Sequence, residues 1–227
     1  RAFAAYGGVY VAASVLWFGA LGDRYGRKKM IVIGMSLAMP ASLVAGLAPT
    51  TEVLIGARII GGLGAGLTFP TTLALITVLW SGPARTKAIA LWSALGTGSA
   101  VLGPLVSGAL LQSFAWGSVF LVTIPLAALG LILAVKFVPS GLAESKTPVD
   151  NYGGVLSALM VGALVVALNI VAAPNLQTLA LVLLGIAVVI AVLFVIRQRK
   201  APNPLYDLDV ARRPTFWVAG LAGIIIF

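Results

Sequence analysis

The sequence predicts an all-α integral membrane protein, and three observations lead to that fold class. Of its 227 residues, 60% are apolar and 9% are charged, and the mean hydropathy is +1.09. Soluble domains contain about 45–50% apolar and about 25% charged residues, so water could not solvate a surface of this composition. The apolar residues also lie in runs of about 20, the length of a membrane-crossing helix. They lack the period-two alternation of a transmembrane strand.

Eight such runs follow one another along the chain, separated by short polar or charged connections. Because the connections are short, helices that are neighbours in the sequence are expected to lie antiparallel in space. The runs cover about residues 4–21, 30–48, 53–79, 88–111, 114–137, 152–172 and 179–196, and the eighth begins near residue 215.

The basic residues divide the connections into two alternating sets. The connections at 49–52, 112–113 and 173–178 hold none, whereas the other set holds thirteen of the fifteen Lys and Arg residues. Cytoplasmic loops carry the excess of Lys and Arg, so loop 22–29 and the rest of the basic set are expected to be cytoplasmic, in a multi-pass protein of the cytoplasmic membrane. The thirteen are Arg24, Arg27, Lys28, Lys29, Arg85, Lys87, Lys136, Lys146, Arg197, Arg199, Lys200, Arg212 and Arg213.

The net charge of +9 therefore reflects membrane topology. A patch for anionic lipid headgroups is compatible with it. No nucleic acid is expected as a partner, because the sequence has no basic stripe with interleaved aromatic residues. The absence of Cys and His from the sequence excludes a thiolate or imidazole metal site and a disulfide framework. No cofactor is expected, and an enzyme is the weakest interpretation because no Ser–His pair or metal cluster is present.

The most charged stretch is GALGDRYGRKK, residues 19–29. A solvated cytoplasmic loop explains its bases but not the single acid, the glycines or their spacing. Gly26 permits a tight turn with a positive φ. Asp23 would be stabilised at a helix N-terminus or beside an Arg.

This stretch resembles the signature loop between the second and third helices of major facilitator superfamily transporters. The family pattern is Gly, three residues, Asp, a base, any residue, Gly, Arg and two bases. In that family the Asp and the Arg form a cytoplasmic latch between domains, which favours the outward-open state and breaks for inward opening. The resemblance implies this role for Asp23 and Arg27. The matching residues are Gly19, Asp23, Arg24, Gly26, Arg27, Lys28 and Lys29.

The third run carries RIIGGLGAG, in which Arg58 is expected to be buried in the membrane. A charge at this depth is costly and usually faces a cavity or a partner; a side chain that snorkels outward is the alternative. The stretch resembles the family's fourth-helix motif through Arg58, Gly62 and Gly64, whereas Gly61 stands where Gln is usual. In proton-coupled members this Arg is associated with proton transfer. Close helix packing is the simpler explanation for the glycines.

The fourth run carries SAVLGPLVSG. On general grounds a Gly–Pro pair in a membrane helix is a kink, and Gly103 would let a neighbouring helix pack into the bend. The stretch resembles the fifth-helix motif of the antiporter branch through Gly103, Pro104 and Gly108, with Ser99 and Ser107 at two glycine positions. The resemblance implies export rather than import.

The fifth run opens with FAWGSVFLVTIP, which looks like the corresponding run of fourteen-span drug–proton antiporters, including quaternary-ammonium and multidrug efflux pumps. Trp116, Phe120, Leu121 and Pro125 match, and Thr123 stands where Asn is usual. Two further spans and the linker NPLYDLDVARRPTF are similar to that branch as well.

The resemblance implies a partial helical bundle, from about span 2 to the start of span 9. Residues 1–139 would hold spans 2–6, which make most of the N-terminal six-helix bundle. Residues 140–196 would hold two additional spans, 7 and 8. Residues 197–227 would hold a cytoplasmic linker and the start of span 9.

No acidic residue falls inside an apolar run. Proton-coupled export of a cation needs an intramembrane carboxylate that titrates and meets the substrate. We therefore expect the chain to be a piece of a longer transporter, with that carboxylate in the absent first helix or the absent second half. The acids in connections or at span ends are Asp23, Glu52, Glu144, Asp150, Asp207 and Asp209.

The resemblance predicts proton-coupled export of amphipathic, cationic drugs or biocides by alternating access. The partners would be the bilayer, a small-molecule substrate and protons, and the full-length transporter would be monomeric. Two alternatives stay open: export of an endogenous product such as an antibiotic or lipid, and a truncated membrane scaffold without transport. Four aromatic residues could hold a cation by the π-face or could equally pack or line the interface: Tyr6, Tyr10, Trp17 and Trp92.

Overall fold

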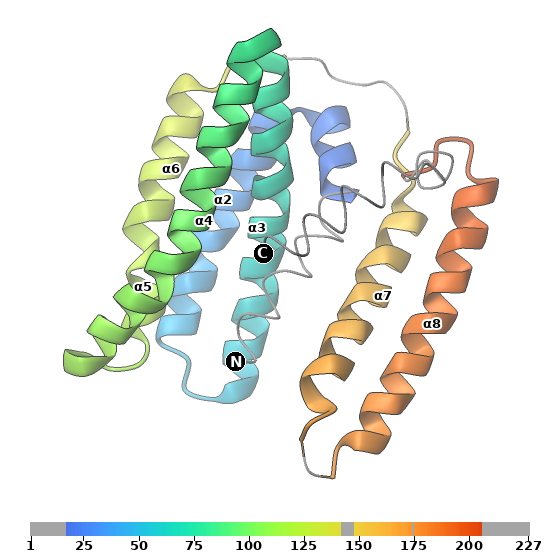
Figure 1. Ribbon diagram of the computed structural model, residues 1–227. Helices are drawn as coiled ribbons and strands as arrows, with labels where there is room; N and C mark the ends of the chain where they lie inside the picture. Colours follow the sequence, from blue (N-terminus) through green and yellow to red (C-terminus); the bar gives the residue numbers. More distant parts are fainter. Residues whose placement is uncertain (1–16, 142–147, 174, 206–227) are drawn as a thin grey trace. The chain divides into compact units, whose positions relative to one another are not determined.

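The computed structural model describes residues 17–141, 148–173 and 175–205. In this part of the chain the structure is helical and contains no strand, which confirms the all-α fold class. Residues 17–25 are helical. They are followed by α2 (Arg27–Gly46), α3 (Thr51–Leu79), α4 (Gly82–Ser113), α5 (Ser118–Leu121), α6 (Thr123–Phe137), α7 (Asn151–Ile170) and α8 (Gln177–Lys200) (Figure 1).

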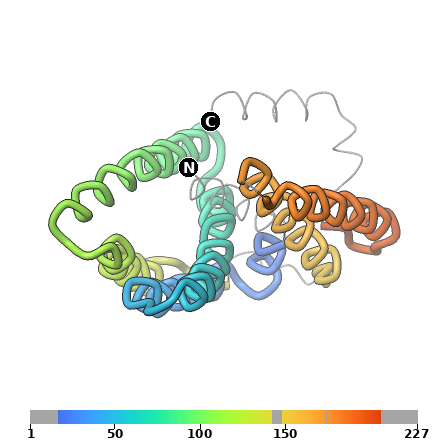
Figure 2. Tube along the Cα trace, turned by 90° about the horizontal axis from the view of Figure 1, so that it is seen from below, coloured from blue at the N-terminus to red at the C-terminus, as the bar shows by residue number. Residues whose placement is uncertain are grey.

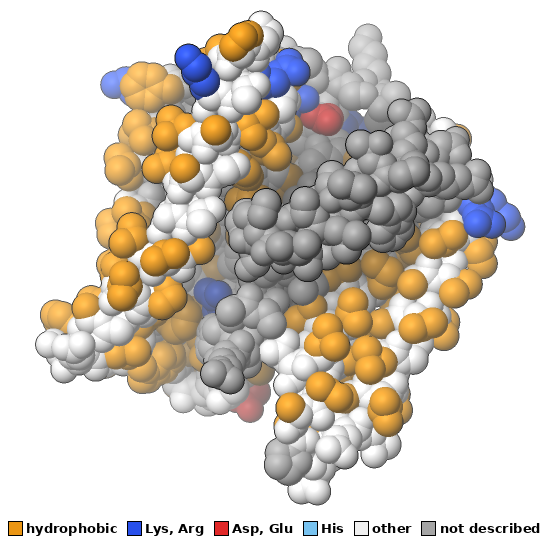
Figure 3. All heavy atoms as spheres, in the orientation of Figure 1, with side chains coloured by type: hydrophobic (Ala, Val, Ile, Leu, Met, Phe, Trp, Pro, Cys, Tyr) orange, Lys and Arg blue, Asp and Glu red, His pale blue; other side chains and the backbone are white. Residues whose placement is uncertain are grey.

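Six helical stretches of the described residues are long and apolar enough to cross a membrane, counting α5 and α6 together. They correspond to the second to seventh predicted runs. Most of the first run and the whole eighth run lie outside the described residues, as do Tyr6 and Tyr10. Large aliphatic side chains are exposed along the spans (Figure 3). Such extended apolar surface is what a lipid-facing protein presents.

The chain divides into two compact units, Phe18–Lys146 and a second unit made of Arg1–Trp17 and Thr147–Phe227. In the first unit α2 packs against α3, α5 and α6, whereas α4 contacts chiefly α3 and α5, the elements before and after it (Figure 2). In the second unit α7 and α8 pack as an antiparallel pair (Figure 1). The connection between them includes Asn175 with a positive φ of 64°, a conformation that Asn tolerates better than most residues.

The crossing of α2 and α3 is a close helix–helix contact in the first unit. A Cβ added to Gly34 would lie 2.5 Å from the carbonyl oxygen of Gly64 and 2.3 Å from Oγ1 of Thr68. A Cβ added to Gly64 would in turn lie 2.5 Å from the carbonyl oxygen of Gly34. Between membrane helices, close packing of small residues replaces the hydrophobic driving force, so both glycines are required for this approach.

The core of the first unit is small, because most of its buried apolar residues are alanines. Among the described residues, a buried apolar cluster joins α2, α3 and α6 through Ile31, Leu75 and Ala134, with Met35 and Val138 packed against it. In this cluster α3 and α6 thus pack against α2, which leaves the outer faces of the three helices to lipid.

Two predicted boundaries around the fifth run are wrong. The turn predicted at 112–113 belongs to α4, which continues to Ser113, and the chain turns at 114–117 instead of starting a helix there. Neither Gln nor Ser breaks a helix, whereas Phe114 has an extended backbone (φ −126°, ψ 160°) that ends it. Gly117 then lies against the backbone of Gly46, which fixes the turn.

The bases predicted in connections lie largely within the helices, in their first two turns or their last. In α4 the reason is Pro83, because proline fits the first turn of a helix and lets the helix begin before Arg85 and Lys87. Cations in a last turn are favoured by the helix dipole. Within each unit, taken separately, they gather at one end of the helices (Figure 3). These bases are Arg27, Lys28, Lys29, Arg85, Lys87, Lys136, Arg197, Arg199 and Lys200.

We predict that Gly34→Ala destabilises the protein by about 1–3 kcal/mol, because the added methyl group overpacks the α2–α3 crossing against backbone. Gly56→Ala on α3 is the matched control, since a Cβ there meets nothing within 4 Å. It should be neutral or stabilising, because alanine favours a helix more than glycine does. Thermal unfolding of the purified protein in detergent, followed by tryptophan fluorescence, compares the two. Equal midpoints for both variants would contradict the role of the crossing.

Candidate functional site

The predicted latch residues lie around the break between helical residues 17–25 and α2. Gly26 has a φ of 98°, a left-handed conformation that favours glycine, and it is the N-cap of α2. The amide of Gly26 donates to the carbonyl of Gly22, and the carbonyl of Gly26 accepts from the amide of Met30. The break therefore redirects the chain without leaving these backbone groups unpaired.

Asp23 and Arg27 form an ion pair across this break, in which Nη2 of Arg27 donates to Oδ1 of Asp23. The Arg27 side chain is 9% exposed and the Asp23 side chain 43% exposed. A charge-assisted hydrogen bond to a buried guanidinium is stronger than a surface pair. The structure thus brings together the two residues to which the resemblance gives the latch role.

The other residues of this motif fix the loop to its neighbours. A Cβ on Gly22 would lie 3.0 Å from Oγ1 of Thr71, and one on Gly19 would lie 4.0 Å from Cβ of Pro70, so the glycines let this segment approach α3. Nζ of Lys28 donates to the carbonyl of Val135 at 2.8 Å, at the C-terminal end of α6 where a cation is favoured.

The two remaining bases of the motif stay near the surface. The guanidinium of Arg24 lies 5.5 Å from the ring centroid of Tyr25. Lys29 is exposed.

Arg58 lies within the candidate membrane span α3, and its side chain is exposed on the surface of that helix. Its guanidinium carbon lies 5.4 Å from the ring centroid of Phe120. The glycines of the same motif have other surroundings. Gly64 is buried at the α2–α3 crossing, and Gly62 is half-buried.

The expected packing of a helix into the Gly–Pro bend of α4 is not found among the described residues. Pro104 lies inside the continuous helix, and a Cβ on either Gly103 or Gly108 meets nothing within 4 Å. All three residues are exposed, and no residue of α4 is buried. The reason is that α4 contacts the first unit chiefly through its neighbours in sequence.

Of the aromatic candidates, Trp92 packs on Phe69 with ring centroids 4.7 Å apart, and its indole N–H donates to Oγ1 of Thr72 at 3.3 Å. Trp17 belongs to the second unit, where its indole N–H donates to Oδ1 of Asn151 at 3.2 Å. Both indoles therefore serve packing and hydrogen bonding.

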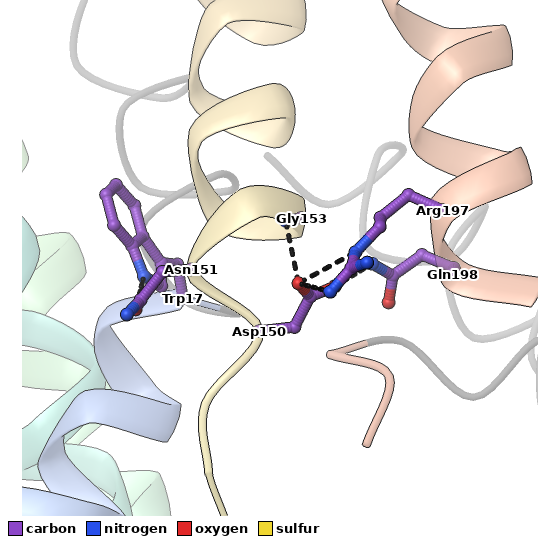
Figure 4. A network of polar contacts seen from close by, with 6 residues as sticks. All are labelled: Trp17, Asp150, Asn151, Gly153, Arg197 and Gln198. Carbon is purple, nitrogen blue, oxygen red and sulfur yellow. Dashed lines mark hydrogen bonds and ion pairs between the residues drawn. The ribbon is translucent and has the colours of Figure 1, made fainter. Parts of the chain in front are cut away.

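Sequence reasoning missed a polar network at the start of α7 (Figure 4). Asp150 is the N-cap of α7, and its carboxylate accepts from the amide of Gly153 at 3.1 Å. Oδ1 also accepts from Nε and Nη2 of Arg197, at 3.0 and 2.8 Å, and Oδ2 accepts from Nε2 of Gln198 at 3.1 Å. The network joins the first residue before α7 to the last turn of α8.

The Asp150 side chain is 2% exposed, so its charge depends on these partners. Burial opposes ionisation and is the largest influence on its pKa. The hydrogen bonds from Arg197, Gly153 and Gln198 and the charge of Arg197 outweigh it and hold the pKa of Asp150 below its ordinary value. Arg197 also lies over the ring of Tyr152, at 5.5 Å from its centroid. An acid directly before a helix was the available signal, but nothing in the sequence pairs it with a base 47 residues later.

Comparisons with known proteins agree with the resemblance in the motifs. Residues 2–227 match the Major Facilitator Superfamily. The chain is 34% identical to the multidrug efflux pump LfrA of Mycolicibacterium smegmatis, over 96% of this chain and 45% of that protein. It is 34% identical to the methylenomycin A resistance protein of Streptomyces coelicolor, over 96% and 46%. It is 38% identical to the methyl viologen resistance protein SmvA of Salmonella typhimurium, over 62% and 28%. The chain thus spans less than half the length of these relatives.

We predict that Asp150→Asn lowers the stability of the α7–α8 pair by about 1–3 kcal/mol at neutral pH, because it removes the charge while keeping a good N-cap residue. Arg197→Gln should cost at least as much, since it leaves a buried carboxylate. Arg199→Gln, in the same turn and exposed, is the matched control and should have no effect. Tryptophan fluorescence during thermal unfolding measures all three variants.

The same ion pair should respond to pH with a definite sign. Because the folded-state pKa of Asp150 is lowered, its stabilisation is complete above the unfolded-state pKa of about 3.9. The stabilisation is lost as the pH falls through the lower folded-state value. The difference in stability between the unmodified protein and Asp150→Asn should therefore shrink in acid. A constant difference from pH 7 to pH 3 would contradict this assignment.

Proposed function

The chain belongs to the Major Facilitator Superfamily of transporters, and from this we propose that the protein exports amphipathic, cationic small molecules across the cytoplasmic membrane. The observation that carries the proposal is the 34% identity to a multidrug efflux pump along 96% of the chain. The ion pair of Asp23 and Arg27 adds a structural element suited to a transporter that changes conformation.

The proposed substrate class rests on the relatives. One relative confers resistance to methyl viologen, an aromatic dication. A cation of this kind is attracted to the faces of aromatic rings. We therefore propose lipophilic cations as substrates, taken up in a cavity between two helical bundles of the complete protein.

In the proposed mechanism the Asp23–Arg27 pair is one state of a latch. The pair lies at the basic end of its unit, which the distribution of Lys and Arg favours as the cytoplasmic end. Opening toward the cytoplasm would separate the pair and require other partners for Arg27, whose side chain is 9% exposed. That cost makes the two states discrete and allows substrate or proton binding to shift their populations.

Proton coupling requires a titrating carboxylate within the membrane. Among the described residues the acids lie at helix ends: Asp23 near the end of residues 17–25, Glu52 in the first turn of α3 and Asp150 before α7. We propose that the coupling carboxylate lies elsewhere in the complete protein and that the described part supplies the latch.

Export of an endogenous product is a second candidate function. One relative is a methylenomycin A resistance protein, and this name does not refer to a cation. The same fold could therefore export a neutral or anionic antibiotic, and the substrate test below separates the two.

We predict that proteoliposomes containing the complete protein transport a fluorescent lipophilic cation when a pH gradient is imposed, and that dissipating the gradient with an ionophore abolishes net transport. Liposomes without protein are the control for leakage. Transport that ignores the gradient would remove proton coupling, and no transport of any cation tested would remove the proposed substrate class.

We predict that Asp23→Asn reduces turnover more than substrate affinity, because it weakens the latch without touching the binding cavity. A reduction of about tenfold corresponds to the loss of one charge-assisted hydrogen bond of about 1.5 kcal/mol. Glu52→Gln, which neutralises an exposed acid at the other end of α3, is the matched control and should transport normally. Unchanged turnover in Asp23→Asn would reduce the motif to a topology signal.

A further inference from the structure

Arg58 is a cation within a membrane span. It lies seven residues after the start of α3 (Thr51–Leu79), which places it about 10 Å along the helix. An ionised side chain at such a depth is expensive unless the protein supplies a partner. In the described part of the chain no hydrogen bond or ion pair of Arg58 is found. Its guanidinium carbon lies over the ring of Phe120, 5.4 Å from the centroid.

This distance is within the range of a cation–π interaction. A guanidinium is planar and weakly hydrated, so it pairs with an aromatic face more readily than an ammonium does. The interaction needs no second charge and strengthens as water is removed. An aromatic ring can therefore hold a membrane arginine where no carboxylate is present.

The backbone around Phe120, in the short helix α5, is held by contacts on both sides of the residue. Gly117 precedes α5 and approaches Gly46 so closely that an added Cβ would lie 1.9 Å from the carbonyl oxygen of Gly46. On the other side, the hydroxyl of Thr123 is hydrogen-bonded to the carbonyl of Phe120 at 2.6 Å and to the hydroxyl of Ser42 at 2.9 Å. Two contacts with α2 thus hold the segment that carries the ring.

The ring itself is held by a second aromatic residue. Trp116 packs edge-on against Phe120, with centroids 6.1 Å apart and an interplanar angle of 82°. This geometry is the favourable one for two quadrupoles. The ring of Phe120 therefore has contacts with both Trp116 and Arg58, while its backbone is tied to α2.

We propose that Phe120 is a positioning residue that holds the guanidinium of Arg58 by a cation–π interaction. The interaction engages the guanidinium from the ring face and leaves its five N–H donors available to an acceptor during the transport cycle. Thr123, Gly117 and Trp116 place the ring. The inference deepens the proposed function and rests on it, because it assigns how an intramembrane charge of the transporter is kept in position.

The test replaces Phe120 in the complete protein by phenylalanines with one, two and three fluorine atoms. These keep the shape of the ring but progressively remove the negative potential of its face, so the fold is retained. Transport of the fluorescent cation should fall stepwise with fluorination. Phe120→Leu should lower it about tenfold or more, as expected for a desolvated cation–π interaction, and Phe120→Tyr should restore it. Phe114→Leu, an exposed phenylalanine at the end of α4, is the matched control.

A second measurement does not depend on transport. In protein with 15N-labelled arginine, the Nε–H signal of Arg58, assigned through Arg58→Lys, should show an upfield ring-current shift. The shift should vanish in Phe120→Leu and persist in Phe120→Tyr. Its absence in the unmodified protein, or transport that is insensitive to fluorination while the unmodified protein transports, would overturn the inference. Failure of the unmodified protein to transport would overturn the proposed function alone, since the arginine signal still decides the contact.

Discussion

Inside a bilayer a polar group has no water to bind, so the protein must supply every partner itself. In the described part of this chain, hydroxyl groups and full charges find their partners in different ways. Hydroxyls inside the spans bond to the backbone of their own helix, as Thr68 does with Gly64 and Thr71 with Leu67. Full charges are placed at helix ends, where partners and solvent are within reach. Arg58 is the exception, and an aromatic ring takes the place of a counterion.

The two ion pairs show how placement at a helix end changes what a charge can do. The Asp150 carboxylate receives four hydrogen bonds from three residues and is 2% exposed. Such a group is costly to separate, and it suits a permanent fastening of α7 to α8. Asp23 is 43% exposed and pairs with Arg27 across a break at Gly26. Water can replace that partner on one side, so this pair is the one suited to open and close.

The positions of the spans could be predicted from the sequence because hydropathy and charge act locally. The helices α2 to α8 begin and end within a few residues of the predicted runs, apart from α4, which begins earlier, and the turn at 114–117. The pairing of Asp23 with Arg27 was also within reach of the sequence, since the two residues are only four positions apart. The Asp150–Arg197 pair and the Arg58–Phe120 contact could not be predicted. Each joins residues far apart in the sequence, and hydropathy does not determine which faces of two spans meet.

The glycines of the spans also show that the sequence does not determine which faces of the helices meet. Gly34 and Gly64 allow the backbones of α2 and α3 to touch, whereas Gly103 and Gly108 on α4 meet nothing within 4 Å in the described part of the chain. In the sequence all four are small residues in apolar runs, and each could equally be a packing position. Only the tertiary contacts separate them. Packing in the described unit therefore explains the glycines of α2 and α3. It does not explain those of α4, whose resemblance to an exporter motif is carried by the sequence alone.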